Sequence, residues 1–208
     1  MGFYNRHILP RLLDCACGVG PIEKQRAKVV PLARGEVVEV GIGSGLNLPF
    51  YDAARVDAVT GIDPDAALWR RAAGRVAACG FPVRRLGLSG EAIPLPDSSA
   101  DTVVVTYALC TIPDPVGALR EMGRVLRPGG RILFTEHGRA PDAATARWQA
   151  RIDPLWRRVA GGCHTGRDTP ALLREAGLAI DWMEQMFIPG PKVLSYNYWG
   201  AATHGDTA

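Results

Sequence analysis

Short, almost wholly apolar runs alternate with longer amphipathic stretches through the middle of this chain. The runs are rich in β-branched residues and lie at 36–40, 58–62, 83–88, 101–107 and 131–136. Runs of this length and composition are typical of parallel strands buried on both faces. Helical patterns at 65–79 and 115–126 lie between them. Because strands alternate with helices, the pattern predicts a doubly wound α/β sheet that is mostly parallel.

The C-terminal part of the chain shows a different pattern. A short helix is predicted at 169–176, with Asp168 or Thr169 as its N-cap. Two further strands are predicted at 179–188 and 193–199, on either side of a Pro-Gly-Pro turn. They favour an antiparallel hairpin at the edge of the sheet.

The N-terminal 33 residues are predicted to be helical. Between residues 3 and 17, Tyr4, Ile8, Leu12 and Cys15 fall on one stripe, with Pro10 as an expected kink. Residues 18–21 break this helix, and a second helix with Lys and Arg on its outer face is expected at 22–33. The first segment could cover a site as a lid or dock on a membrane surface.

Length and composition narrow the class of protein. A chain of 208 residues suits one domain, 1–208, and 47% apolar with 22% charged residues is typical of a globular protein. The net charge of +3, without a dense basic run, gives no sign of nucleic-acid binding. The apolar runs are too short for a membrane span. Five cysteines without paired spacing predict free thiols, no metal site and a cytoplasmic protein.

A glycine loop follows the first predicted strand. Gly41, Gly43 and Gly45 follow G-x-G-x-G, and Asp63 ends the second strand. The loop by itself is either an ordinary strand-to-helix turn or the turn of a nucleoside-binding βαβ unit. Asp63 lies where a ribose-binding acid is expected, which favours the second reading. The pattern differs from the usual G-x-G-x-x-G/A of nicotinamide dehydrogenases, which remain an alternative.

Further polar residues fall at the carboxyl ends of the predicted strands, where ligands bind in open α/β sheets. These end segments are 39–45, 63, 89–91, 106–110 and 136–137. We therefore expect them to converge on one crevice.

Four ordered motifs resemble those of class I S-adenosylmethionine-dependent methyltransferases. They are Val-Glu-Val-Gly-Ile-Gly-Ser-Gly from Val38, Gly-Ile-Asp-Pro from Gly61, the segment from Gly90 to Asp101, and Arg-Val-Leu-Arg-Pro-Gly-Gly-Arg-Ile-Leu from Arg124. The third is similar to the form found in ubiquinone/menaquinone-biosynthesis methyltransferases. The resemblance implies a Rossmann-like sheet of seven strands with its core at 36–138, and substrate-side helices and the final strand pair at 139–208.

Other segments resemble the branch that includes alkyl-thiol methyltransferases. They are Tyr4-Asn5, the segment from Leu109 to Pro115, Glu136-His137, Trp148-Gln149, Pro154-Leu-Trp156 and Gly161-Gly-Cys163. Animal members of that branch carry an N-terminal membrane anchor, and this chain begins without one. The expected location is therefore cytoplasmic, with residues 3–17 as a possible peripheral contact with the inner membrane surface.

The resemblance also implies roles for the cofactor-binding residues. Gly41 and Gly43 would approach the methionine moiety, and Gly45 would serve packing. Glu39 either acts on the cofactor's ammonium group or makes a structural hydrogen bond. Asn47 either donates to the cofactor's carboxylate or caps the next helix. Asp63, followed by Pro64, either accepts the two ribose hydroxyls or caps that helix. The adenine would lie against Gly90 and Glu91, unless Glu91 faces solvent, and Thr106 would lie near the methyl group.

On the acceptor side, a sulfonium favours aromatic faces, for which Tyr107 and Tyr4 are candidates. A thiol acceptor must react as the thiolate, so His137 or His164 could accept its proton, although a histidine is often structural. Cys110 and Cys163 could line the acceptor pocket or simply be buried.

The expected activity is methyl transfer to a small-molecule acceptor, a thiol or another soft lipophilic nucleophile. Its alternative within the class is N-methylation of a phospholipid or a small amine at a membrane surface. A metalloid methyltransferase using cysteine thiolates and a non-catalytic binding protein are less favoured. The sequence leaves the oligomeric state open.

Overall fold

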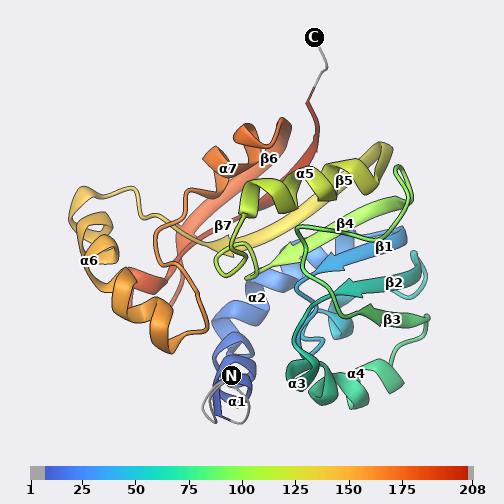
Figure 1. Ribbon diagram of the computed structural model, residues 1–208, viewed down its shortest axis with the longest axis horizontal. Coiled ribbons are helices and arrows are strands. Elements are labelled where there is room, and N and C mark those ends of the chain that lie inside the picture. The colour runs from blue at the N-terminus through green and yellow to red at the C-terminus, as the bar shows by residue number, and fades with distance from the viewer. Residues whose placement is uncertain (1–7, 206–208) are drawn as a thin grey trace.

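A computed structural model describes residues 8–205 and confirms the predicted sheet, which has seven strands in the order β3-β2-β1-β4-β5-β7-β6 (Figure 1). The strands are β1 Gly35–Val40, β2 Val56–Ile62, β3 Val83–Leu86, β4 Ala100–Thr106, β5 Leu126–His137, β6 Leu178–Phe187 and β7 Tyr196–His204. The first five pair in parallel, and β7 lies antiparallel between β5 and β6. The antiparallel edge pair predicted from the sequence is therefore present.

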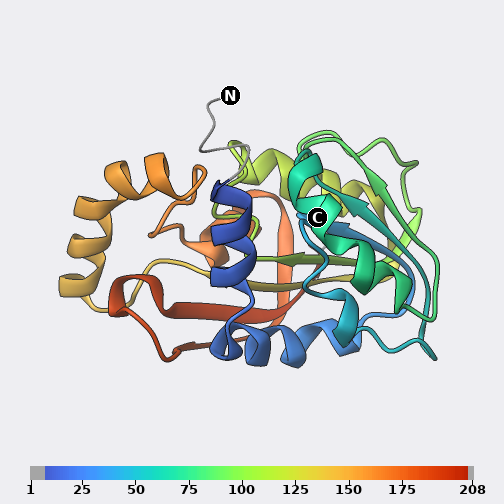
Figure 2. The same cartoon turned by 90° about the horizontal axis from the view of Figure 1, so that it is seen from below.

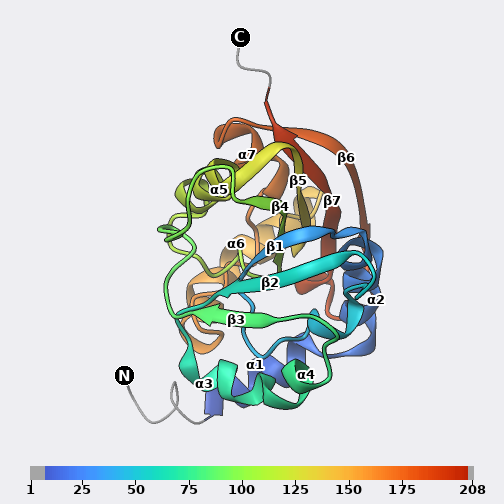
Figure 3. The same ribbon diagram turned by 90° about the vertical axis from the view of Figure 1, so that its right-hand side faces the viewer.

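Helices cover both faces of the sheet, and Figure 3 shows α5 and α7 on one side and α2 on the other. The α-helices are α1 Leu9–Cys17, α2 Gly20–Val29, α3 Ala66–Trp69, α4 Ala73–Ala77, α5 Pro115–Val125, α6 Ala143–Val159 and α7 Thr169–Glu175. Short 3-10 turns lie at Val30–Leu32, Leu48–Phe50, Arg70–Ala72 and Lys192–Leu194.

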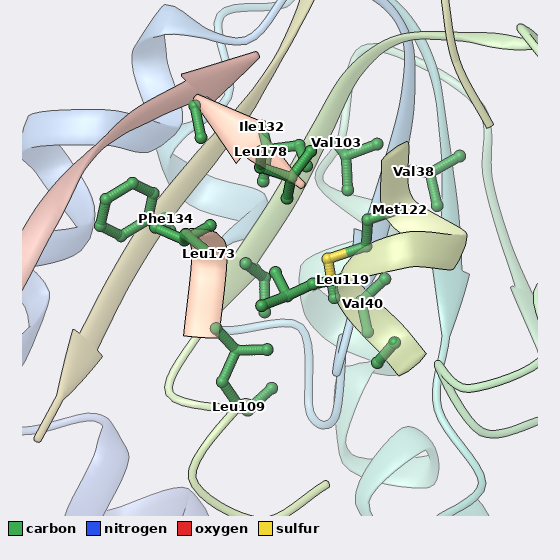
Figure 4. Packing of buried hydrophobic residues seen from close by; sticks show 14 of the residues in the cluster. Val38, Val40, Val103, Leu109, Leu119, Met122, Ile132, Phe134, Leu173 and Leu178 are labelled. Carbon is green, nitrogen blue, oxygen red and sulfur yellow. The ribbon is translucent and has the colours of Figure 1, made fainter. Parts of the chain in front are cut away.

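Side chains of the central strands alternate between two hydrophobic cores. Val103 and Val105 of β4 pack with Leu119 and Leu173 from α5 and α7, in the core shown in Figure 4. Val104 points to the opposite face and packs in the core that contains Val29 of α2. Both faces of β4 are thus buried, which explains the uninterrupted valine run in the sequence.

The N-terminal helices differ in detail from the prediction. The kink expected at Pro10 is wrong, because this proline lies in the first turn of α1, where its missing N–H costs no hydrogen bond. The break predicted over residues 18–21 is too long, since α2 already begins at Gly20 with Pro21 in its first turn. Tyr4, Asn5 and the start of the predicted 3–17 helix lie outside the described residues.

Other boundaries also differ. The helix predicted at 65–79 is divided into α3, a 3-10 turn and α4. The strand predicted at 131–136 is longer, since β5 already begins at Leu126, and its pairing with β4 shifts register between Ala100 and Thr102. In contrast, Asp168 is confirmed as the N-cap of α7, because its Oδ1 accepts a 3.0 Å hydrogen bond from the backbone N–H of Ala171. Every helix in residues 8–205 is too short or too polar to cross a lipid bilayer.

Candidate functional site

A cavity of about 310 Å³ opens at the carboxyl ends of β1, β2 and β4. Its volume falls in the range of roughly 300–1,000 Å³ typical of small-molecule sites. Helix α1 covers it with Leu9, Leu13, Asp14 and Cys17. Figure 2 shows this helix, in blue, between α3 and α6. Of the residues predicted to bind a cofactor, those that line the cavity are Glu39, Gly41, Gly43, Asp63, Pro64, Gly90 and Thr106.

The glycine loop brings backbone to the wall of this cavity. Gly41 and Gly43 have φ angles of +78° and +51°, which disfavour residues with a Cβ. A side chain on Gly41 would also collide with Ala108. Gly45 packs against Leu48 and Ala72 and is not part of the cavity wall. Gly41 and Gly43 therefore form part of the cavity wall, and Gly45 allows close packing beneath it.

Asp63 lies directly after β2 and accepts a hydrogen bond from the glycine loop. Its Oδ2 accepts a 2.9 Å hydrogen bond from the backbone N–H of Gly43, and its Oδ1 accepts one of 2.7 Å from Asp65. The N-cap of α3 is Asp65, which accepts from Ala67 and Leu68, so the capping alternative for Asp63 is wrong. Burial raises the pKa of Asp63, although the two backbone hydrogen bonds oppose this shift. A carboxylate has about four acceptor sites, so its free lone pairs can accept two vicinal hydroxyl groups.

Glu39, at the end of β1, belongs to a buried polar network. Its Oε1 accepts a 3.0 Å hydrogen bond from Asn47 Nδ2, and its Oε2 accepts one of 2.7 Å from the Tyr51 hydroxyl. Asn47 also donates to Thr106 Oγ1 at 2.9 Å. Burial raises the pKa of Glu39 from 4.5 to about 7. Asn47 is buried behind the cavity wall and holds Glu39 and Thr106 in place.

Arg26 is a residue of this site that the sequence analysis missed, since it expected the basic residues of α2 to face outward. Its side chain is only 4% exposed, and its Nη1 donates to Asn47 Oδ1 at 2.7 Å and to Thr106 Oγ1. Within residues 8–205 its Nε has no hydrogen-bond partner. Arg26 precedes Val29 and Val30 by three and four positions, and both are fully buried. That helical spacing was the available signal.

Residues after β3 form another part of the wall. Ser89 and Gly90 line the cavity, and a Cβ on Gly90 would come within 2.6 Å of Val40 Cγ1. Glu91 does not line it: its Oε1 accepts a 2.6 Å hydrogen bond from the backbone N–H of Asp114, and its Oε2 accepts one of 2.9 Å from the Ser89 hydroxyl. Glu91 thereby supports the segment that contains Ser89 and Gly90.

Tyr107 follows β4 and borders the cavity in a rare backbone conformation. Its φ of +52° lies in the left-handed region, which costs energy for an aromatic residue and is typical of functional sites. The hydroxyl donates to Asn197 Oδ1 at 2.6 Å, and the guanidinium carbon of Arg26 lies 5.1 Å from the ring centroid. The ring stacks on His137 at 6.5 Å between centroids. These contacts fix one aromatic face at the cavity.

The residues predicted for the acceptor side divide into two groups. Cys110, His137 and Cys163 meet, and Cys163 Sγ lies 3.2 Å from His137 Nε2. None of the three is part of the cavity wall, although His137 stacks on Tyr107. His164 borders a second cavity beside α6, where its Nδ1 lies 3.3 Å from Asp153 Oδ2.

A glycine loop, an acid after the second strand and a cavity at the strand ends together define an α/β enzyme that binds a nucleoside cofactor. A family model described as a methyltransferase domain matches residues 38–134. Thiol S-methyltransferase TMT1B of Rattus norvegicus is 32% identical over 168 residues, covering 76% of this chain and 68% of that protein. Phosphatidylethanolamine N-methyltransferase of Cereibacter sphaeroides is 38% identical over 124 residues, covering 57% of this chain and 60% of that protein.

The fold agrees with the similarity in sequence. A solved SAM-dependent methyltransferase from Methanosarcina mazei matches with a TM-score of 0.64 at 22% identity, over 82% of this chain and 92% of that one. The chain belongs to the family of S-adenosylmethionine-dependent methyltransferases, and S-adenosylmethionine is its cofactor. The carboxylates of Asp63 and Glu39 on the cavity wall are acceptors that fit this cofactor's hydroxyl and ammonium groups.

Proposed function

We propose that this enzyme methylates a small lipophilic thiol, which it binds as the thiolate. The observation that carries the proposal is the buried, positively charged guanidinium of Arg26 on the cavity wall. The acids on the same wall already accept hydrogen bonds, as Asp14 does from Ser44 and Arg71. The positive charge of Arg26 favours an anionic acceptor over a protonated amine.

The cofactor-binding roles follow from the same geometry. We assign the ribose hydroxyls to Asp63, the adenine to the wall at Ser89 and Gly90, and the methionine end to Gly41, Gly43 and Glu39. When bound, S-adenosylmethionine supplies a methyl group on a sulfonium, so the protein's main task is to orient the acceptor and exclude water. Tyr107 offers a fixed aromatic face for the positive sulfonium.

An apolar acceptor is supported by the rest of the wall. Leu9 and Leu13 of α1 and Ile112 after β4 line the cavity. In the described part of the chain its wall contains no histidine, so we assign no proton-accepting role to His137 or His164. The positive charge of Arg26 lowers the cost of the thiolate instead. Because α1 lies over this wall, we also propose that it acts as a lid that opens for the acceptor.

The second candidate is N-methylation of a phospholipid headgroup. It is favoured by the similarity to a phosphatidylethanolamine N-methyltransferase and by the exposed Ile8 and Leu12 at the start of the chain. An amine is a nucleophile only when it is neutral, and the positive charge of Arg26 disfavours its protonated form. The same charge stabilises a thiolate but not a neutral amine, and identification of the methylated product distinguishes the two candidates.

The test uses methyl-labelled S-adenosylmethionine and acceptors with the same carbon skeleton and a different nucleophile, such as hexanethiol, hexylamine and hexanol. Vesicles with and without phosphatidylethanolamine form a second arm. We expect the label in methyl hexyl sulfide. Label in the amine or in the lipid would contradict the thiol proposal.

An Arg26→Gln variant refines the test, with Arg26→Lys as the control that keeps the charge. Losing a charge-assisted interaction of about 1.5–3 kcal/mol lowers kcat/KM for the thiol by roughly tenfold or more, and lysine restores part of it. Equal activity of the glutamine and lysine variants would remove the electrostatic argument.

A further inference from the structure

Three side chains with soft or borderline ligand atoms converge behind Tyr107. Cys110 comes from the turn after β4, His137 from the end of β5, and Cys163 from the loop after α6. Their ligand atoms all lie within 4.8 Å of one another, and Cys163 Sγ is 3.2 Å from His137 Nε2. Cys110 is 4% exposed, and His137 Nδ1 is buried without a hydrogen-bond partner in residues 8–205.

The backbone around these side chains is firmly held. The backbone N–H of His164 donates to the carbonyl of Cys110 at 2.8 Å, which ties the two cysteine-bearing segments together. Arg167 Nη1 donates to the carbonyls of Leu109 and Ile112, which flank the same turn. His137 is paired with Asn197 of β7 inside the sheet. The cluster is therefore built on a rigid scaffold rather than on a free loop.

We propose that Cys110, His137 and Cys163 form a binding site for one Zn²⁺ ion. Two cysteine sulfurs and one histidine nitrogen are a ligand set that zinc uses, with Zn–S about 2.3 Å and Zn–N about 2.0–2.1 Å. Tetrahedral geometry then sets the ligand atoms roughly 3.5–3.8 Å apart. Because the atoms observed here are 3.2 Å to at most 4.8 Å apart, shifts of roughly 1 Å complete the site.

The charges at the site are balanced by such an ion. Two thiolates and Zn²⁺ together are neutral, and the guanidinium of Arg167 interacts electrostatically with both cysteines of the cluster. Without the metal, the hydrogen bond with Cys110 and burial raise the pKa of the Cys163 thiol. Three protein ligands leave a fourth position for water or another small ligand.

This inference departs from the metal-free site expected from the sequence. The three residues are 26 to 53 positions apart and show none of the close spacings of zinc knuckles. The site also lies outside the cofactor cavity, so zinc binding is independent of both the cofactor and the identity of the methyl acceptor.

The test measures metal binding directly. The full chain is purified under reducing conditions, stripped with a chelator, and titrated with Zn²⁺ and with Co²⁺ as a spectroscopic substitute. We expect one equivalent of Zn²⁺, and with Co²⁺ the sulfur-to-cobalt charge-transfer and intense visible bands of a tetrahedral thiolate site. Cys110→Ser and Cys163→Ser should each weaken binding by roughly 100-fold or more, since even outer-shell changes cost 10–100-fold. Cys79→Ser, a cysteine outside the cluster, should bind as the parent does.

A second measurement, on the unchanged protein, tests the proposal even if the serine variants do not fold. In the unchanged protein, Zn²⁺ should protect two thiols from a thiol-reactive reagent, and mass spectrometry should identify them as Cys110 and Cys163. Protection of Cys15 and Cys17 instead, or equal zinc binding by a folded Cys110→Ser/Cys163→Ser double variant, would overturn the proposal. So would the absence of saturable binding to the reduced protein, including a result in which only a Cys110–Cys163 disulfide forms on oxidation.

Discussion

Replacement of Asp63 by alanine should weaken cofactor binding in a protein that still folds. Its carboxylate is buried and accepts hydrogen bonds of 2.9 Å and 2.7 Å from the backbone N–H groups of Gly43 and Asp65. If it also accepts two ribose hydroxyls, each charge-assisted bond contributes about 1.5–3 kcal/mol. Loss of both therefore costs at least about 3 kcal/mol of binding free energy, or more than roughly 100-fold in Kd.

Calorimetric titration with S-adenosylhomocysteine measures this loss, and chemical denaturation measures the accompanying loss of stability. The matched control is Asp168→Ala, which also removes a carboxylate that accepts a backbone hydrogen bond, at the start of α7. It should cost about 1 kcal/mol of stability and leave the affinity unchanged. A folded Asp63→Ala protein that binds within threefold of the parent would refute the assignment of the ribose to this residue.

Three further predictions concern the walls of the cavity. Because the folded-state pKa of Glu39 is raised from 4.5 to about 7, the folded protein holds this proton more tightly, and stability falls as pH rises from 4.5 to 7. In Glu39→Gln, the free energy of unfolding should lose about 3 kcal/mol of its decrease between pH 4.5 and 7, as measured by chemical denaturation. If the variant and the parent show the same pH dependence, the raised pKa of Glu39 is contradicted. Gly90→Ala should lower the melting temperature and the cofactor affinity through the contact with Val40, whereas Gly74→Ala, with open space around its Cβ position, should be slightly stabilising. Tyr107→Phe should cost about 1 kcal/mol of stability but keep methyl transfer, while Tyr107→Ala should reduce the transfer rate about tenfold; equal rates would exclude a role for the ring.

The strands could be predicted where burial on both faces makes the sequence apolar throughout. The valine run of β4 has both faces buried, so its sequence is apolar throughout. The place of Asp63 on the cavity wall could be predicted because it ends the second strand after the glycine loop, and parallel strand ends meet at one edge of the sheet. The bounds of helix α6 were not predicted, because Pro154 lies inside it and its buried side chains are the polar Thr145 and Gln149.

The candidate site was predicted where its residues lie at the carboxyl ends of strands, because these ends meet at one edge of the sheet. Arg26 was missed because a buried arginine depends on partners in other elements, here Asn47 and Thr106. The contact between Cys163 and His137 could not be found, since it depends on how the loop after α6 returns to the sheet. Asn47, predicted to contact the cofactor or cap a helix, lies behind the wall because its amide groups are used by Glu39, Thr106 and Arg26.

The position of β7 has a consequence for how the protein is made. This strand comes after β6 in the chain, yet it lies between β5 and β6, and β6 joins the sheet only through it. Until Tyr196–His204 has joined the sheet, β6 therefore has no partner strand, and its unpaired backbone is open to incorrect association. A chain that ended between residues 188 and 196 would keep the glycine loop but lack β7, and its sheet would remain open at β5.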